Sequence, residues 1–204
     1  MNRFEKRIPT ALALFIIGFL FQFMTAADSI PSEEKSSPTD TIVLGGGCFW
    51  CVEALYETLD GVQAVESGYA GGSVANPSYK AVVTGTTGHA EVIKVTFDPQ
   101  TISLDRILSF FWQAHDPTTL NRQGEDVGTQ YRSIILYSSP EQKAAAERSM
   151  AKAQNSFSQP IVTEIVALET FYKAEGYHQD YFENNKTAPY CQYVIAPKLK
   201  KLEQ

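Results

Sequence analysis

The stretch from Thr41 to Glu53, TIVLGGGCFWCVE, constrains the fold more than any other part of the chain. It opens with a short apolar run typical of a buried strand, and three glycines then predict a tight turn. From Phe49 the pattern predicts a helix that ends at Leu59. Cys48 then lies at a helix N-terminus, where unpaired N–H groups and the helix dipole favour an ionised, acidic thiol. We interpret Cys48 as a nucleophile; the alternative is a buried structural thiol.

The residues that follow Cys48 predict the environment of its sulfur. Phe49 and Trp50 place two large rings beside the sulfur, which indicates an aromatic pocket. Cys51 completes a Cys-x-x-Cys pattern, found both in redox pairs and in half of a zinc site. No second ligand pair follows and the three histidines are scattered, so we expect no metal. A Cys48–Cys51 disulfide should distort the helical turn that carries Cys51.

Residues 1–27 have the pattern of an export signal: a basic start, an apolar run and a small-residue cleavage site. The apolar run, Ala11–Phe21, is short for a membrane-spanning helix, which needs about 20 residues. We therefore expect an exported protein, periplasmic or secreted. The alternative is an uncleaved segment that anchors the chain to a membrane.

The charge composition argues against some classes of binding partner. The formal net charge is −6, and removing residues 1–27, with their three bases and one acid, leaves −8. An acidic chain without basic clusters argues against nucleic acid or anionic lipid as partner. Three cysteines are an odd number for an exported chain, so at least one thiol is expected to do chemistry.

The remaining pattern indicates one domain. Residues 28–40 are polar and Pro/Ser-rich, typical of a flexible linker, and residues 41–204 contain no second linker. Interleaved strands and helices with short connections predict an α+β fold, a two-layer sandwich with a mixed sheet. Further strands are predicted at Val62–Tyr69, Glu91–Phe97, Arg132–Tyr137 and Val162–Leu168, with helices from the Ser103 cap to His115, from the Ser139 cap to Asn155 and over Ala174–Asn184, followed by an irregular tail.

Glu91 is the second candidate for chemistry. In a strand its side chain shares a face with Ile93, Val95 and Phe97. A carboxyl on an apolar face is desolvated, which raises its pKa and keeps it protonated, so that it can donate a proton at neutral pH. The alternative is a carboxylate at a strand end that reaches water.

Three polar residues near loops are weaker candidates. Tyr79 and Tyr131 lie close to predicted junctions between loops and elements, but the chain has ten tyrosines, most of which should serve packing. Asp126 lies in a polar loop, Pro117–Gln130, long enough to suggest a function. Spacing alone does not identify the two tyrosines as site residues, and a lone acidic residue such as Asp126 is usually solvated.

Six short motifs occur in order along the chain: Gly47-Cys48-Phe49-Trp50, Gly68-Tyr69-Ala70-Gly71-Gly72, Gly88-His89-Ala90-Glu91, His115-Asp116-Pro117-Thr118-Thr119, Asp126-Val127-Gly128-Thr129-Gln130-Tyr131-Arg132-Ser133 and Tyr177-His178-Gln179-Asp180-Tyr181. Together they resemble the A-type peptide methionine sulfoxide reductases, over about residues 41–203. The resemblance implies a ferredoxin-like sandwich, no metal or organic cofactor, and thiol-dependent reduction of methionine S-sulfoxide, free and in proteins.

The resemblance also implies roles. Cys48 matches the cysteine that attacks the sulfoxide sulfur and becomes a sulfenic acid. Glu91 matches the acid that protonates the sulfoxide oxygen, and Tyr79 and Tyr131 match tyrosines that hydrogen-bond to it. The pocket residues Phe49, Trp50 and Asp126 match those that bind the substrate. We expect a monomer that repairs oxidised proteins and takes electrons from a thioredoxin-like reductant.

The thiol that resolves the sulfenic acid is where the chain departs from the commonest family pattern. Many members have glycine at the position of Cys51, and many carry two cysteines in a glycine-rich tail, whereas this chain has only Cys191 there. By resemblance we favour Cys191, on a mobile C-terminal segment, with Cys51 as the alternative and a relay through both also open. Two other functions remain as alternatives: a disulfide oxidoreductase that uses Cys48 and Cys51, and a binding module with a structural disulfide.

Overall fold

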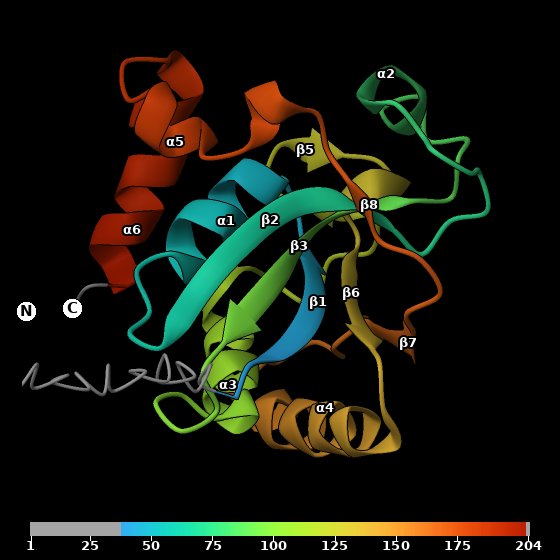
Figure 1. The fold of residues 1–204 in the computed structure, drawn as a ribbon, viewed down its shortest axis with the longest axis vertical. Coiled ribbons are helices and arrows are strands. Elements are labelled where there is room, and N and C mark those ends of the chain that lie inside the picture. Colours follow the sequence, from blue (N-terminus) through green and yellow to red (C-terminus); the bar gives the residue numbers. More distant parts are fainter. Residues whose placement is uncertain (1–37, 203–204) are drawn as a thin grey trace, which may run out of the picture. The chain divides into compact units, whose positions relative to one another are not determined.

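A computed structural model describes residues 38–202 of the chain, which belong to one compact unit spanning residues 36–204. The predicted signal, residues 1–27, lies outside the described residues. The strands are β1 (Asp40–Gly46), β2 (Val62–Ala70), β3 (Ala90–Phe97), β4 (Arg122–Gln123), β5 (Asp126–Val127), β6 (Ser133–Tyr137), β7 (Glu164–Ala167) and β8 (Tyr172–Lys173). The helices are α1 (Phe49–Tyr56), α2 (Tyr79–Val82), α3 (Leu104–Ala114), α4 (Pro140–Ala153), α5 (Tyr181–Asn184) and α6 (Ala196–Leu202) (Figure 1).

Six strands form one mixed sheet in the order β7-β6-β1-β3-β2-β8. All neighbours are antiparallel except β6 and β7, which are parallel. The central strands follow the order β1-α1-β2-β3-α3-β6 along the chain and β6-β1-β3-β2 across the sheet, which is the ferredoxin-like arrangement. The predicted α+β sandwich with a mixed sheet is therefore confirmed.

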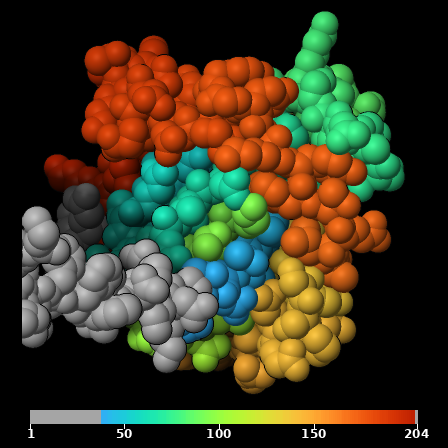
Figure 2. Space-filling view, in the orientation of Figure 1, coloured from blue at the N-terminus to red at the C-terminus, as the bar shows by residue number. Residues whose placement is uncertain are grey.

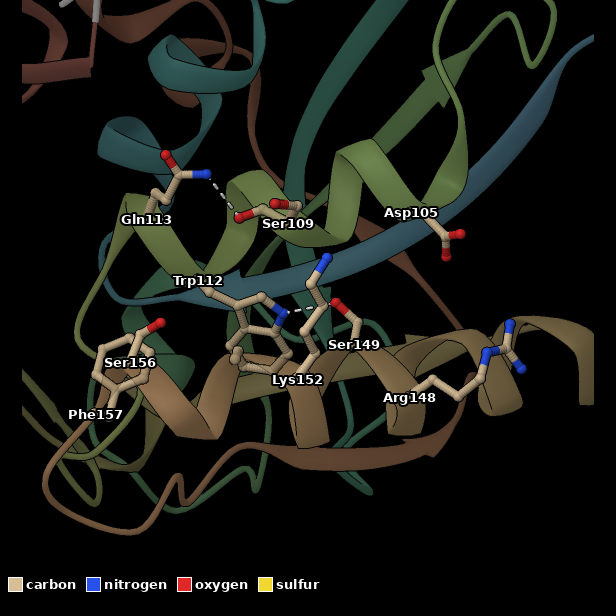
Figure 3. A pocket seen from close by; sticks show the side chains of 10 residues that line it. Asp105, Ser109, Trp112, Gln113, Arg148, Ser149, Lys152, Ser156 and Phe157 are labelled. Atoms are coloured by element: carbon tan, nitrogen blue, oxygen red, sulfur yellow. Dashed lines mark hydrogen bonds between the residues drawn. The ribbon is translucent and has the colours of Figure 1, made fainter.

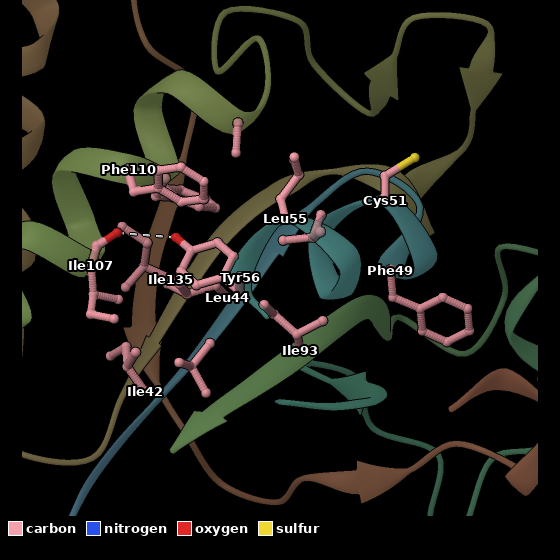
Figure 4. Packing of buried hydrophobic residues seen from close by; sticks show 14 of the residues in the cluster. Ile42, Leu44, Phe49, Cys51, Leu55, Tyr56, Ile93, Ile107, Phe110 and Ile135 are labelled. Atoms are coloured by element: carbon pink, nitrogen blue, oxygen red, sulfur yellow. Dashed lines mark hydrogen bonds between the residues drawn. The ribbon is translucent and has the colours of Figure 1, made fainter. Parts of the chain in front are cut away.

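The two faces of the sheet are covered differently. One face buries alternate residues of β1, β3 and β6 against α1, α3 and α4. Leu44, Ile93 and Leu55 belong to this buried cluster (Figure 4). The other face buries a smaller cluster that includes Val92 and is covered by Leu168 and Phe171 of the β7–β8 connection. The first part of β3 is therefore buried on both faces, whereas Lys94 and Thr96 further along its second face are half-buried.

Helix starts follow the local signals in the sequence. The hydroxyls of Ser103 and Ser139 each accept a hydrogen bond from a backbone N–H in the first turn of α3 and α4, both at 3.2 Å. Pro140 occupies the first position of α4, where its missing N–H has no intrahelical partner to lose. Gln142 reaches back to the N–H of Ser138 at 2.9 Å, one residue before the position that a capping box uses.

The C-terminal region is where the prediction is wrong. The predicted helix over Ala174–Asn184 is a short 3₁₀ turn, Gly176–His178, followed by α5, because Asp180 adopts a left-handed conformation with φ 52° between them. The predicted irregular tail is instead a π-helical turn, Cys191–Ile195, that continues into α6. Apolar residues at 191, 194, 195, 199 and 202 have the helical spacing that predicts this. This segment contacts α1. In the space-filling view the C-terminal part of the chain, in orange-red and red, lies along the upper left of the molecule (Figure 2).

A cavity of about 450 Å³ lies between α3 and α4, with Trp112 and Phe157 as its apolar wall and Arg148 and Lys152 among its polar lining (Figure 3). The indole N–H of Trp112 donates a hydrogen bond to Ser149 at 2.8 Å across it. None of the residues that the sequence nominates for chemistry lines this cavity. Among residues 38–202, no helix has the length and apolar character needed to cross a membrane.

Candidate active site

Cys48 lies where β1 passes into α1. Gly47 has φ +99°, a left-handed conformation that lets the chain turn sharply before the helix. Cys48 is the N-cap of α1, with φ −57° and ψ 123°, so its backbone is not yet helical. The predicted order of strand, turn and helix is confirmed and places the sulfur at the helix N-terminus. Its predicted bounds differ, since Gly45 and Gly46 still belong to β1 and α1 ends at Tyr56 and not at Leu59.

The protonation of Cys48 differs from the prediction. Burial raises the pKa of the Cys48 thiol well above its usual value, and the neighbouring Cys51 and Glu91 raise it further. Only 8% of the residue is exposed, so the loss of water outweighs the favourable helix terminus. The prediction of an ionised Cys48 is therefore wrong for the substrate-free protein. A hydrogen bond from Cys48 instead lowers the pKa of the Cys51 thiol to about 7.

The close approach of Cys48 and Cys51 follows from their helix positions. Cys48 is the N-cap and Cys51 the third helical residue, the two positions whose side chains meet in a capping box. The expectation that a disulfide between them would distort a helical turn assumed that both residues are helical. Cys48 is not, so that objection to Cys51 does not hold.

Glu91 reaches the same helix terminus from β3. The residue is 2% exposed, and its Oε2 accepts a hydrogen bond from the backbone N–H of Phe49 at 3.1 Å. Burial raises the pKa of Glu91 to about 8, although the Phe49 hydrogen bond opposes this shift. The prediction that burial keeps this carboxyl protonated at neutral pH is confirmed. Since one oxygen accepts from Phe49, the other is left to carry the proton.

An aromatic wall flanks the cysteine. Trp50 stacks on Tyr181 with ring centroids 3.6 Å apart and planes 7° apart. The indole N–H of Trp50 donates to Nδ1 of His178 at 3.1 Å, and the His178 ring lies 4.9 Å from that of Phe49. Phe49 is buried and Trp50 half-buried, so the side chain of Trp50 retains a solvent-facing part.

Both predicted tyrosines belong to this region. Burial raises the pKa of Tyr79 and of Tyr131, and the charges of Glu91, Cys48 and Asp126 raise them further. These shared causes mean that the two phenols face one electrostatic environment. Both stay protonated at neutral pH and can donate hydrogen bonds.

Asp126 and Cys51 are joined through Tyr190. The Tyr190 hydroxyl donates to Oδ2 of Asp126 at 2.9 Å, and its oxygen lies 3.5 Å from Sγ of Cys51. Cys191, the next residue, is fully buried in the π-helical turn. All three cysteines are free thiols. The structure thus places Cys191 in a packed helix and not on the irregular segment that the sequence predicts.

Sequence reasoning assigned no role to three residues of this site. Glu175 accepts hydrogen bonds from the Tyr69 hydroxyl at 2.8 Å and from the Tyr79 backbone N–H at 2.9 Å. His178 lies among the aromatic rings, and Tyr190 connects two predicted site residues. The motif Tyr177–Tyr181 and the Pro-Tyr-Cys tripeptide were visible signals, but neither indicated which partner each side chain meets.

Within residues 38–202, no group of three or more histidine, cysteine, aspartate or glutamate side chains is arranged to hold a metal ion. What the site offers is a paired thiol, a neutral carboxyl and two phenols beside aromatic rings. This set can transfer protons and form covalent sulfur intermediates.

Comparisons with known proteins agree with the motifs. The family model for peptide methionine sulfoxide reductase matches residues 40–204. A peptide methionine sulfoxide reductase MsrA of Leptospira borgpetersenii is 59% identical over 158 residues, covering 78% of this chain and 90% of the relative. One of Trichodesmium erythraeum is 56% identical, covering 81% and 94%. The structure of reduced Mxr1 from Saccharomyces cerevisiae is similar with a TM-score of 0.72 and 37% identity, covering 75% of this chain and 89% of Mxr1.

The matched region contains the whole α+β domain and every residue of the site described above. Sequence identities of 59% and 56% over most of both chains show a shared family. The chain belongs to the peptide methionine sulfoxide reductase family and is an oxidoreductase.

Proposed function

We propose that the protein reduces methionine S-sulfoxide, free and in proteins, to methionine in a thiol-dependent reaction. One observation carries this most directly: the Cys48 sulfur and a neutral Glu91 carboxyl meet at the N-terminus of α1. A nucleophile and a proton donor on the same site are what removal of a sulfoxide oxygen requires.

The first step transfers the oxygen. The Cys48 sulfur attacks the sulfoxide sulfur and forms an S–S bond while Glu91 gives its proton to the sulfoxide oxygen. The resulting hydroxyl then moves to the Cys48 sulfur as the S–O bond to the substrate and the new S–S bond break. The substrate sulfur is reduced by two electrons to methionine, and Cys48 is oxidised by two electrons to a sulfenic acid. The hydrogen bond between the thiols lets Cys51 take the Cys48 proton as the attack proceeds.

The surrounding residues bind and orient the substrate. Tyr79 and Tyr131 donate hydrogen bonds to the sulfoxide oxygen, since both hydroxyls stay protonated. Phe49 and Trp50 hold the methyl group against their rings. Asp126, half-buried at the edge of the site, accepts from a polar group of the substrate backbone.

Recycling requires a second thiol. The Cys48 sulfenic acid condenses with Cys191 or Cys51 to give an intramolecular disulfide, which an external thiol reductant reopens. A thioredoxin-like protein is the proposed reductant. In support, a structure of Mxr1 from Saccharomyces cerevisiae in complex with Trx2 resembles this chain with a TM-score of 0.52 and 28% identity.

We infer export from residues 1–27, which have a basic start, an apolar run and a small-residue cleavage site. The protein would then repair methionine outside the cytoplasm, as a monomer, with an electron donor in the same compartment. The alternative is an anchor formed by the uncleaved segment.

An assay on both sulfoxide epimers tests the function. With a dithiol as reductant, we expect turnover of a peptide containing methionine S-sulfoxide and none of the R epimer, because a fixed donor and nucleophile fit one configuration. Chiral chromatography of the remaining sulfoxide measures both rates. Equal consumption of the epimers, or no consumption of either, would contradict the proposal.

Glu175 is expected to position Tyr79 in this site. Its carboxylate holds the Tyr79 backbone and the Tyr69 hydroxyl together, so Glu175→Gln loses one of two accepted hydrogen bonds. We expect kcat to fall roughly tenfold, equivalent to about 1.4 kcal/mol, as Tyr79 loses its position. Steady-state kinetics of Glu175→Gln and of the exposed control Glu169→Gln measure this.

A double variant separates positioning from a general loss of stability. If Glu175 acts through Tyr79, adding Tyr79→Phe to Glu175→Gln should cost much less than Tyr79→Phe costs alone. Fully additive losses would show that the two residues act independently.

A further inference from the structure

Side-chain contacts connect Cys51 through Tyr190 to Asp126, and the donors and acceptors along them are defined when Cys51 carries a proton. Tyr190 has one hydroxyl hydrogen, and it is donated to Oδ2 of Asp126 at 2.9 Å. The Tyr190 oxygen, 3.5 Å from Sγ of Cys51, is then left as the acceptor of the Cys51 S–H. The contacts therefore form a path along which a proton can pass from sulfur to carboxylate.

The path starts at the thiol that contacts the nucleophile. Cys48 and Cys51 are the N-cap and third residues of α1, positions whose side chains approach each other, and Cys48 lowers the pKa of the Cys51 thiol. Cys191 is fully buried in the π-helical turn. No movement of the C-terminal segment is needed for Cys51 to reach a sulfenic acid on Cys48, whereas Cys191 has to leave its buried position.

We propose that Cys51 is the first thiol to condense with the Cys48 sulfenic acid, and that Tyr190 is a catalytic residue of this step that passes the Cys51 proton to Asp126. This inference rests on the proposed sulfoxide reduction, which supplies the oxidant. Cys191 then acts later, by exchange with the Cys48–Cys51 disulfide.

The atoms and electrons balance. Cys51 leaves the first step protonated, because it takes the Cys48 proton. Its S–H proton moves to the Tyr190 oxygen as the Tyr190 hydrogen moves to Asp126, and the Cys51 thiolate attacks Sγ of Cys48. The Cys48 S–O bond breaks and an S–S bond forms. The leaving hydroxide takes the proton back from Asp126 and departs as water, so Asp126 returns to its starting state. In this step the Cys51 sulfur is oxidised from the thiol to the disulfide level and the Cys48 sulfur is reduced from the sulfenic to the disulfide level.

The pKa of Cys51 responds to its surroundings on all sides. The titratable and charged groups that face it are Cys48, Glu91, Asp126, Tyr190, Cys191 and Lys198. The hydrogen bond from Cys48, followed by the charge of Lys198 and the Tyr190 contact, lowers the pKa of Cys51, and burial and Asp126 raise it. Oxidation of Cys48 removes the hydrogen bond that lowers the pKa most, so Cys51 then needs a proton acceptor.

The test separates the two steps in a single turnover without external reductant. Full-length wild type, Tyr190→Phe and the control Tyr193→Phe, whose side chain is 78% exposed on the same segment, are mixed with a methionine S-sulfoxide peptide. Rapid quench measures released methionine, and a sulfenic-acid trap measures the sulfenic acid that has not condensed. We expect Tyr190→Phe to lower the ratio of condensation rate to methionine-release rate by roughly 10²-fold, the lower end of proton-transfer catalysis.

Two further readouts distinguish a proton path from a structural role. The deficit of Tyr190→Phe should shrink as pH rises, because solvent then deprotonates Cys51 directly, and Cys191→Ser should still yield a Cys48–Cys51 disulfide by peptide mapping. An unchanged ratio in Tyr190→Phe, a deficit that is independent of pH, or accumulation of sulfenic acid without disulfide in Cys191→Ser would each overturn the proposal. Absence of methionine release from wild type would instead overturn the proposed function itself.

Discussion

Cys48→Ser is expected to abolish methionine sulfoxide reduction, leaving no turnover above the rate without enzyme. The serine hydroxyl is a far weaker nucleophile than a thiol and cannot form the sulfenic acid that stores the transferred oxygen. The fold should survive, because serine is a preferred N-cap and Cys48 caps α1 without a side-chain hydrogen bond of its own. Methionine release from a sulfoxide peptide, measured beside a circular dichroism melt, checks both statements.

Cys51→Ser and Cys191→Ser serve as matched controls, since each also replaces a buried thiol by a hydroxyl. Both should release one methionine per enzyme molecule in the absence of reductant, because Cys48 is the one thiol that the first step oxidises. Normal turnover by Cys48→Ser would show that another group attacks the substrate, and the mechanism would have to be abandoned.

Glu91→Gln is expected to slow sulfoxide reduction by about 10²–10⁴-fold, the range typical of a lost general acid. The amide oxygen of glutamine can still accept the hydrogen bond from Phe49, so the helix terminus keeps its contact while the transferable proton is lost. Glu53→Gln is the matched control, because Glu53 is an equally buried carboxyl whose pKa burial also raises. Single-turnover rates of the three proteins compare the effects.

The role of Glu91 also predicts how the reduction rate changes with pH. Burial raises the pKa of Glu91 to about 8, so the proton donor is present below that pH and is lost as pH rises through it. Wild-type reduction should therefore decline above about pH 8, and the residual rate of Glu91→Gln should not show this decline. A wild-type rate that keeps rising through that region, or an unaltered rate in Glu91→Gln, would remove Glu91 from the mechanism.

The sequence predicts the site best where local rules decide the structure. Three glycines followed by an aromatic pair place Cys48 at a helix N-terminus, and alternation along β3 places Glu91 on the buried face. The caps Ser103 and Ser139 mark the starts of α3 and α4 for the same reason. These features depend on residues within one turn or one strand, so they can be predicted without knowing the tertiary contacts.

Features that depend on distant contacts could not be read from the sequence. The pKa of Cys48 follows from burial by elements far along the chain, which reverses the direction that the helix terminus alone predicts. Glu175 holds Tyr69 and Tyr79 through contacts about a hundred positions apart in sequence. The contact between Tyr190 and Asp126 needs the C-terminal segment to fold back over α1, which local pattern does not determine.

A single isotope experiment tests the central claim that Cys48 takes the oxygen from the substrate. The protein with both Cys51 and Cys191 changed to serine is mixed with a methionine S-sulfoxide peptide whose sulfoxide carries heavy oxygen, and the peptide that contains Cys48 is analysed by mass spectrometry. We predict one heavy oxygen on Cys48 for each methionine released. Methionine release with an unmodified Cys48, or with oxygen that comes from water, would contradict the mechanism.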